Sequence, residues 1–151
     1  MLPIRDENPT LHPPLVTYGL IAANLAVWVL VQGMGAEPAL SQSVCSLGLI
    51  PAEFLGRLPL GTTISLGPDM ACSVHQPGHL FAPLTSMFMH GSWFHVLGNM
   101  WFLHIFGNNV EDVMGGFRFL AFYLLAGLAA AAAQVVAGPG STIPMVGASG
   151  A

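Results

Sequence analysis

Residues 90–99 read His-Gly-Ser-Trp-Phe-His-Val-Leu-Gly-Asn, and this stretch decides how the rest of the chain is interpreted. It lies inside a long apolar run, since no Asp, Glu, Lys or Arg occurs from Met70 to Val110. On a helix, His95 and Asn99 are four residues apart, so their side chains lie one above the other on the same face. Polar side chains in a segment of membrane length are costly when they face lipid, and they require a partner or a water-filled cavity.

The composition places the chain among membrane proteins. Charged residues make up 7% of the 151 residues, whereas soluble domains contain about 25%. Hydrophobic residues make up 54%, the mean hydropathy is +0.68, and lysine is absent. So few charges cannot cover the surface of a soluble domain. The formal charge of -4, without a basic patch, argues against nucleic acid as a partner.

Apolar runs of membrane length divide the chain, and they predict an all-α membrane protein. Residues 1–14 form a short polar tail, and residues 15–151 form one partial transmembrane domain. The predicted spans are residues 15–32, 80–106 and 117–137, with a large loop at 33–79 and a fourth helix beginning near 147. Gly91 is expected to separate a short lead-in from the second helix, and the turn residues and charges of 107–112 to end it.

The loop 33–79 is too long for an ordinary connection in a compact domain, which favours a functional loop. We expect short helices in it, around Ser46–Leu49 and Ala52–Leu58. Two interpretations remain open for its leucines. They dip into the headgroup region, or they are incidental in a solvated loop. The leucines concerned are Leu55, Leu58 and Leu60.

Two further features of the chain bear on packing. Cys45 and Cys72 both fall in the large loop, and an oxidising exterior permits a disulfide between them. The sequence leaves this pairing open, because it does not give the distance between them. The run Gly127–Ala133 is small on every face and predicts close packing of the third span against a neighbour along much of its length. Asn109 or Asp112 is expected to cap the helix that follows it.

The last residues bring in a serine, as Gly147-Ala148-Ser149-Gly150. His95 lies near the start of the second span and Ser149 near the start of the fourth. Helices that enter from the same side of a membrane place these two residues at the same depth. This parity argument predicts that the two segments meet.

A serine hydroxyl attacks a carbonyl only when a base takes its proton, and the resulting oxyanion needs preorganised donors. The imidazole of His95, the amide of Asn99 and the backbone N–H of Ser149 can supply those donors. Gly147 and Gly150 allow a sharp turn and a close approach of substrate. Each motif alone is weak evidence. The serine motif 147–150 is also typical of small-residue packing, and the pair His95 and Asn99 is also typical of a helix–helix hydrogen bond. Together, at matching depth, they indicate a serine hydrolase.

A resemblance to a known family rests on these two motifs and on further residues. The matching residues are His90, the stretch His95–Met100, the stretch Phe106–Asp112 and the stretch Gly147–Gly150. With these residues and the long first loop, the chain resembles the rhomboid family of intramembrane serine proteases over about residues 15–151.

The resemblance implies a protease with six core helices and a Ser–His dyad, which cleaves single-pass membrane proteins near the outer face of the bilayer. It implies that Ser149 is the nucleophile and that His95 and Asn99 stabilise the oxyanion. His90 matches a supporting histidine, and Glu111 matches an acidic residue that holds helices together.

One departure from the family concerns the general base, which the resemblance assigns to a histidine of the sixth helix. No histidine of this sequence matches it, since the sequence stops two residues after Ser149. We therefore expect a truncated chain that is inactive by itself, and a reading frame that continues beyond Ala151.

The sequence also allows functions other than proteolysis. The alternative is a non-catalytic rhomboid-like membrane protein that binds transmembrane clients. A metal or haem site is not expected, because the histidines, His75 and His79 among them, lack further ligands at suitable spacing. No cofactor is predicted, and the expected partners are transmembrane substrates and the lipid bilayer.

The arginines give a prediction of the orientation in the membrane. Arg5 and Arg118 fall on one side of the predicted membrane and Arg57 on the other, which weakly favours a cytoplasmic N-terminus and a site that opens to the outer face.

Overall fold

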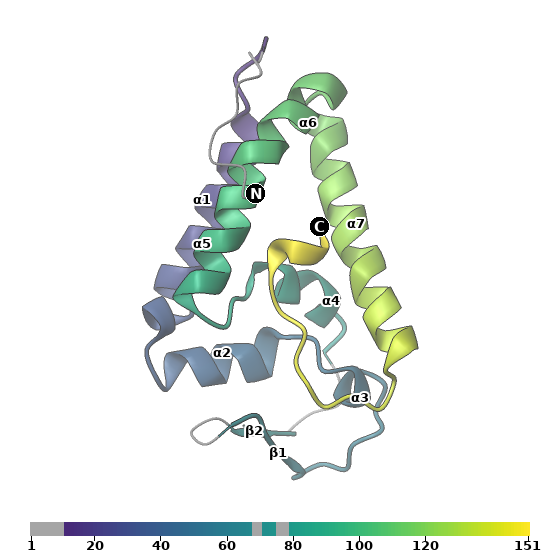
Figure 1. The fold of residues 1–151 in the computed structure, drawn as a ribbon. Coiled ribbons are helices and arrows are strands. Elements are labelled where there is room, and N and C mark those ends of the chain that lie inside the picture. Colours follow the sequence, from purple (N-terminus) through teal and green to yellow (C-terminus); the bar gives the residue numbers. More distant parts are fainter. Residues whose placement is uncertain (1–10, 68–70, 75–78) are drawn as a thin grey trace.

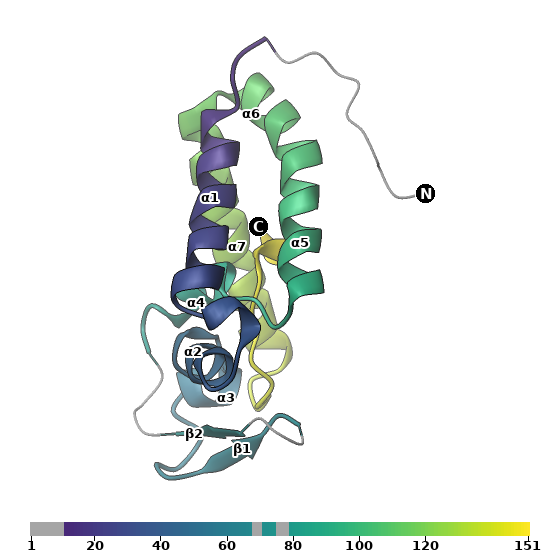
Figure 2. The ribbon, with the colours of Figure 1, turned by 90° about the vertical axis from the view of Figure 1, so that its left-hand side faces the viewer.

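The computed structural model describes residues 11–67, 71–74 and 79–151. Long helices form one end of the molecule, and short helices with a two-stranded hairpin form the other (Figure 1). A view turned by 90° shows α1 and α5 in front of α7 (Figure 2). The α-helices are α1 (Leu15–Leu30), α2 (Ala39–Leu47), α3 (Pro51–Phe54), α4 (Ala82–Thr85), α5 (Trp93–Phe102), α6 (Asn108–Met114) and α7 (Gly116–Ala137). The strands are β1 (Thr63–Ser65) and β2 (Ala71–Ser73).

The second apolar run is not one helix. Its first part contains α4 and the short 3-10 turn Ser86–Phe88, and the continuous helix begins only at Trp93. Ser92 ends the extended lead-in, and its Oγ accepts the backbone N–H of His95 at 3.2 Å, as a helix cap does. The predicted span 80–106 therefore begins too early as a helix, whereas the predicted break near Gly91 is correct.

The expected helix end at residues 107–112 is wrong. From Trp93 the chain stays helical to Met114, passing through a π-helical turn at Leu103–Gly107. Gly107 serves a close approach and not a turn, because a Cβ there would lie 3.1 Å from Cγ2 of Thr17 on α1. The side-chain amide of Asn109 donates to the carbonyl oxygen of Ile105 at 3.1 Å, which accommodates a turn-forming residue inside the helix.

Helix α7 is the described helix that is long and apolar enough to cross a bilayer. It has 22 residues, with a mean hydropathy of 2.0 over its most apolar window. Only 22% of that window is buried inside the structure, so most of its surface is available to lipid. Helix α1 is also apolar, but it has 16 residues.

The small residues of α7 do receive neighbours, but over a short stretch. Gly127 accommodates the side chain of Met87, whose methyl group lies where a Cβ of Gly127 would be. Ala131 is buried, and Ala130 lies against Gly150. Nearer its beginning, α7 also buries Phe119 and Tyr123 in the main core, so the expected packing along much of the helix is confirmed, with larger side chains making part of it.

The large loop folds into a small subdomain. The strands β1 and β2 pair antiparallel, with Ile64 opposite Cys72, and this hairpin was not predicted. A disulfide joins Cys72 to Cys45 on α2, with 5.3 Å between their Cα atoms, and so resolves the pairing that the sequence left open. The two expected short helices are only partly correct, because the helices of this region run over residues 39–47 and 51–54 and not over 46–49 and 52–58. Leu55 and Leu60 are exposed, whereas Leu58 packs onto the hairpin core.

Acidic side chains of α6 hold the beginning of α1. The carboxylate of Glu111 is buried and accepts the backbone N–H of Val16 at 2.9 Å, together with the backbone N–H and the hydroxyl of Thr17, both at 2.7 Å. It therefore satisfies donors that the first turn of a helix leaves unpaired. This contact fits the structural role that the resemblance implied for Glu111.

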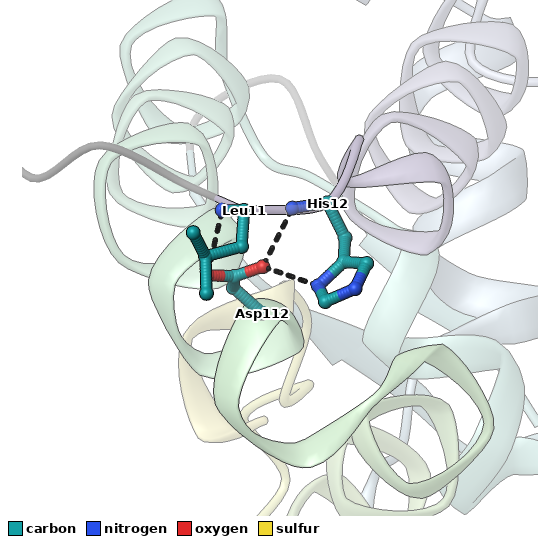
Figure 3. A network of polar contacts seen from close by, with 3 residues as sticks. All are labelled: Leu11, His12 and Asp112. Atoms are coloured by element: carbon teal, nitrogen blue, oxygen red, sulfur yellow. Dashed lines mark hydrogen bonds and ion pairs between the residues drawn. The ribbon is translucent and has the colours of Figure 1, made fainter.

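Asp112 holds the segment just before α1 (Figure 3). Its carboxylate accepts the backbone N–H of Leu11 at 3.0 Å and that of His12 at 2.8 Å, and it contacts Nδ1 of His12 at 3.0 Å. The expectation that Asn109 or Asp112 caps the following helix is therefore wrong. Helix α7 follows Gly115, which has no side chain to cap it. Residues 1–10 of the predicted tail, like His75, lie outside the described residues.

Candidate active site

Helix α5 presents the two polar residues that the sequence singled out. His95 and Asn99 are both half-buried and lie one turn apart. The neighbouring positions Val96 and Met100 are buried in the main core, whereas Phe94 is 92% exposed. The helix thus has an outward apolar face and an inward face, and the imidazole and the amide lie at the edge of the inward face.

The segment before Ser149 is fixed by main-chain hydrogen bonds. Met145 forms an isolated antiparallel bridge with Leu49, with N–H to oxygen distances of 2.8 and 3.1 Å. Farther along the segment, Gly147 donates its N–H to the carbonyl oxygen of Ser86 at 2.9 Å. These bonds bring the end of the described chain between α5 and α7, as Figure 1 shows.

Gly147 is the residue at which this segment meets α5. Its backbone has φ +110° and ψ 155°, a conformation that is essentially restricted to glycine. A Cβ on Gly147 would lie 2.5 Å from Nε2 of His95 and 3.2 Å from Nδ2 of Asn99. Both side-chain nitrogens therefore face the position where Gly147 has only hydrogen.

Asn99 has an unsatisfied donor at this point. Within the described part of the chain, its buried Nδ2 has no hydrogen-bond partner. A buried donor without an acceptor costs about 1–3 kcal/mol, so such an atom is uncommon unless it serves a ligand or a reaction. An acceptor oxygen beside Gly147 would satisfy it.

Ser149 lies in the 3-10 turn Ala148–Gly150, directly after this contact. Its side chain is exposed. Ala148 is buried on one side of it, and on the other side a Cβ at Gly150 would lie 2.7 Å from Cβ of Ala130 on α7. Gly150 therefore serves close packing against α7.

His90 is completely buried and lies beside His95. The two rings are nearly perpendicular, with 5.1 Å between their centroids. Gln32 holds the backbone of His90 with two hydrogen bonds, at 2.7 and 2.8 Å. The structure thus places Gly147 against His95 and Asn99, with His90 beside His95. Gly150 packs against α7, and Ser149 follows Gly147 by two residues, so its role in the site stays a prediction.

Sequence reasoning missed the residues that hold the site in place. Gln32 is a lone amide at the end of an apolar run, and that position could have marked it as a buried partner. Ser86 and Leu49 contribute through backbone atoms, for which the side chains carry no signal. Ala130 lies in the run of small residues that the sequence did single out, but its partner was not predicted.

Comparisons with known proteins identify the family of the chain. The family model of the Rhomboid domain matches residues 77–151, which contain all six residues predicted for the site. A rhomboid-like protein of Arabidopsis thaliana, rhomboid-like protein 11, chloroplastic, is 38% identical over 68 residues. This alignment covers 45% of the present chain and 24% of the plant protein. No solved structure matches the chain significantly.

The chain belongs to the rhomboid family. Family membership makes it a membrane protein, in agreement with the helical fold and with α7. The chain spans about a quarter of the length of the curated relative that it matches.

Proposed function

We propose that this chain forms part of an intramembrane serine endopeptidase that cleaves transmembrane segments of membrane proteins. The observation that carries the proposal is the juxtaposition at Gly147. There, Nε2 of His95 and the unpaired Nδ2 of Asn99 face the backbone two residues before Ser149. A packing motif of small residues would not require two nitrogens to face one glycine.

In the proposed reaction, Oγ of Ser149 attacks the carbonyl carbon of a substrate peptide bond. The carbonyl oxygen becomes an oxyanion, which accepts hydrogen bonds from His95, from Asn99 and from the backbone N–H of Ser149. Each such donor contributes about 3 kcal/mol to stabilising the transition state. Gly147 leaves room for the imidazole of His95 beside the segment that carries Ser149, and His90 supports the ring of His95 by edge-to-face contact.

The proton of Ser149 requires a base that residues 1–151 do not provide in this scheme. His95 is used as a donor to the oxyanion and cannot at the same time accept this proton. The family assigns the base to a histidine of a later helix, so we propose that activity belongs to the full protein.

The proposed topology has three spans, within residues 15–32, 93–114 and 117–137, and an active site that opens to the outer face. The disulfide Cys45–Cys72 supports an oxidising environment for the loop 33–79. The beginning of α7, next to α6, lies at the end of the molecule opposite to α2 and the hairpin (Figure 1), and Arg118 is the third residue of that helix. Arg118 on the cytoplasmic side agrees with the usual distribution of positive residues.

The experiment expresses the full protein with a membrane-anchored reporter that releases a soluble fragment on cleavage. We expect Ser149→Ala to abolish release and to abolish labelling by a fluorophosphonate, which reacts with activated serines. Ser141→Ala is the matched control, because Ser141 lies in the same segment and its backbone contact with Ala52 persists. Cleavage that survives in Ser149→Ala would remove Ser149 from the mechanism.

The same experiment separates the alternative function. A rhomboid-like protein that only binds transmembrane clients would show neither cleavage nor labelling. It would retain client proteins equally well with and without the hydroxyl of Ser149. Inactivity of the wild-type full protein, combined with this retention, would therefore replace the protease proposal by the client-binding one.

A further inference from the structure

We propose that Gln32 is a positioning residue for the oxyanion donor His95, acting through the peptide bond between His90 and Gly91. The inference rests on the proposed function for the catalytic consequence, but its structural part concerns the state of the His95 ring. Gln32 lies two residues after the end of α1 and is 58 residues away from His90 in the sequence. It touches no proposed reacting group.

Gln32 grips the backbone of His90 with both ends of its amide. Its Nε2 donates to the carbonyl oxygen of His90 at 2.7 Å, and its Oε1 accepts the N–H of His90 at 2.8 Å. The side chains of both residues are 0% exposed. Hydrogen bonds in such surroundings are not exchanged for bonds to water, so the amide fixes the backbone at this position.

The peptide bond transmits this constraint to the next residue. The carbonyl group of His90 and the N–H of Gly91 belong to one planar unit with a high barrier to rotation. Fixing the carbonyl oxygen therefore fixes the direction of the Gly91 N–H. That N–H donates to Nδ1 of His95, at a long 3.4 Å.

The direction of this bond has a chemical consequence for His95. A neutral imidazole has one nitrogen that donates and one that accepts. When Nδ1 accepts the N–H of Gly91, the proton of the ring is on Nε2. Nε2 is the atom that faces Gly147, where the proposed reaction needs a donor. The geometry thus connects Gln32 to both the tautomer and the orientation of His95.

A role limited to folding would have a different signature. Loss of the two hydrogen bonds lowers stability in either case, because it leaves two buried backbone groups without partners. Only the positioning role also changes the His95 ring and the turnover of protein that remains folded. The test must therefore measure the ring and the turnover, each per folded molecule.

The experiment uses the full protein with Gln32→Met, which removes both bonds at similar side-chain length. Gln32→Asn is the milder second variant, because it keeps the amide but shortens the side chain by one methylene group. The matched controls are Gln42→Met and Gln42→Asn, on the exposed surface of α2. Turnover of a transmembrane reporter is normalised to the serine that fluorophosphonate titrates, and ¹⁵N spectra report which nitrogen of His95 is protonated.

We expect wild-type His95 to be protonated on Nε2, and the Gln32 variants to show a share of rings protonated on Nδ1. We expect kcat to fall about 10- to 100-fold with KM within about twofold, since one misdirected oxyanion donor affects the transition state more than binding. The Gln42 variants should match the wild type. Gln32 variants with lowered melting temperature but wild-type ring signals and wild-type kcat would overturn the proposal.

The two proposals fail separately in this design. If the wild-type full protein neither cleaves nor labels, while Gln32 variants change the protonation of His95, then the protease proposal fails and the positioning of His95 by Gln32 stands. If the wild type cleaves and the Gln32 variants leave the ring unchanged, then the positioning proposal alone fails. The spectra decide this without reference to activity.

Discussion

Replacement of Gly147 by alanine tests the geometry of the site most directly. The backbone at Gly147 has φ +110° and ψ 155°, and alanine reaches that region at a cost of about 1–3 kcal/mol. The new methyl group would also lie 2.5 Å from Nε2 and 2.8 Å from Cε1 of His95. Carbon and nitrogen atoms in van der Waals contact are about 3.5 Å apart, so the imidazole must move by about 1 Å or the turn must shift.

We therefore expect two separable effects of Gly147→Ala in the full protein. Thermal unfolding in detergent should show a loss of about 1–3 kcal/mol, from the backbone strain. Reporter cleavage per titrated serine should fall at least about 100-fold, because a displacement of about 1 Å at the oxyanion donors has an effect of this size. The larger effect on cleavage identifies the position as part of the site.

Gly140→Ala is the matched control for this variant. Gly140 lies in the same segment, its φ is not positive, and a Cβ there would meet no atom within 4 Å. Its replacement should leave stability and cleavage close to the wild type. Wild-type cleavage and wild-type stability in Gly147→Ala would refute the close contact between Gly147 and α5, and with it the reasoning for the site.

Three further predictions concern stability. Glu111→Gln should cost about 2–4 kcal/mol in thermal unfolding, because an amide cannot accept every hydrogen bond that the carboxylate accepts at the start of α1, and unchanged stability would contradict this capping role. The N–H of Leu11 holds the pKa of Asp112 below its ordinary value, so the stability that this contact provides is present above about pH 4 and is lost as the pH falls through the lowered pKa. Limited proteolysis near residue 11 should therefore increase at that low pH, and Asp112→Asn should remove this pH dependence. Replacement of Cys45 or Cys72 by serine opens a loop of 27 residues and should cost up to about 3.5 kcal/mol, with a change in mobility on non-reducing gels between wild type and variant.

The helices with a strong one-dimensional signal could be predicted from the sequence. The predicted span 117–137 differs from α7 by one residue, because the uncharged, mostly apolar run that follows Arg118 and ends before Gly138 leaves little choice. Helix α1 likewise lies within the predicted 15–32. The serine motif and His95 could be brought together by parity, because apolar helices in a membrane must alternate in direction.

The second apolar run shows where sequence patterns fail. Its end was predicted from Gly107 and the asparagines, which are turn residues in isolation. In the folded chain, Gly107 allows α1 to approach, and this tertiary contact overrides the local preference. The hairpin of β1 and β2 has strands of only three residues each, too short for alternation to be recognised. The bond between Gln32 and His90 links residues 58 positions apart, and no local pattern encodes it.

The capping of α1 by Glu111 has a consequence for the order of synthesis. The N–H groups that Glu111 satisfies are 94 and 95 residues upstream of it, so the ribosome must translate that whole interval before the first helix acquires its carboxylate. At about 5–20 residues per second, the delay is about 5–20 s. During this time, water, lipid headgroups or the insertion machinery must satisfy the exposed amides at the start of α1. The first helix to be made is thus among the last to be finished.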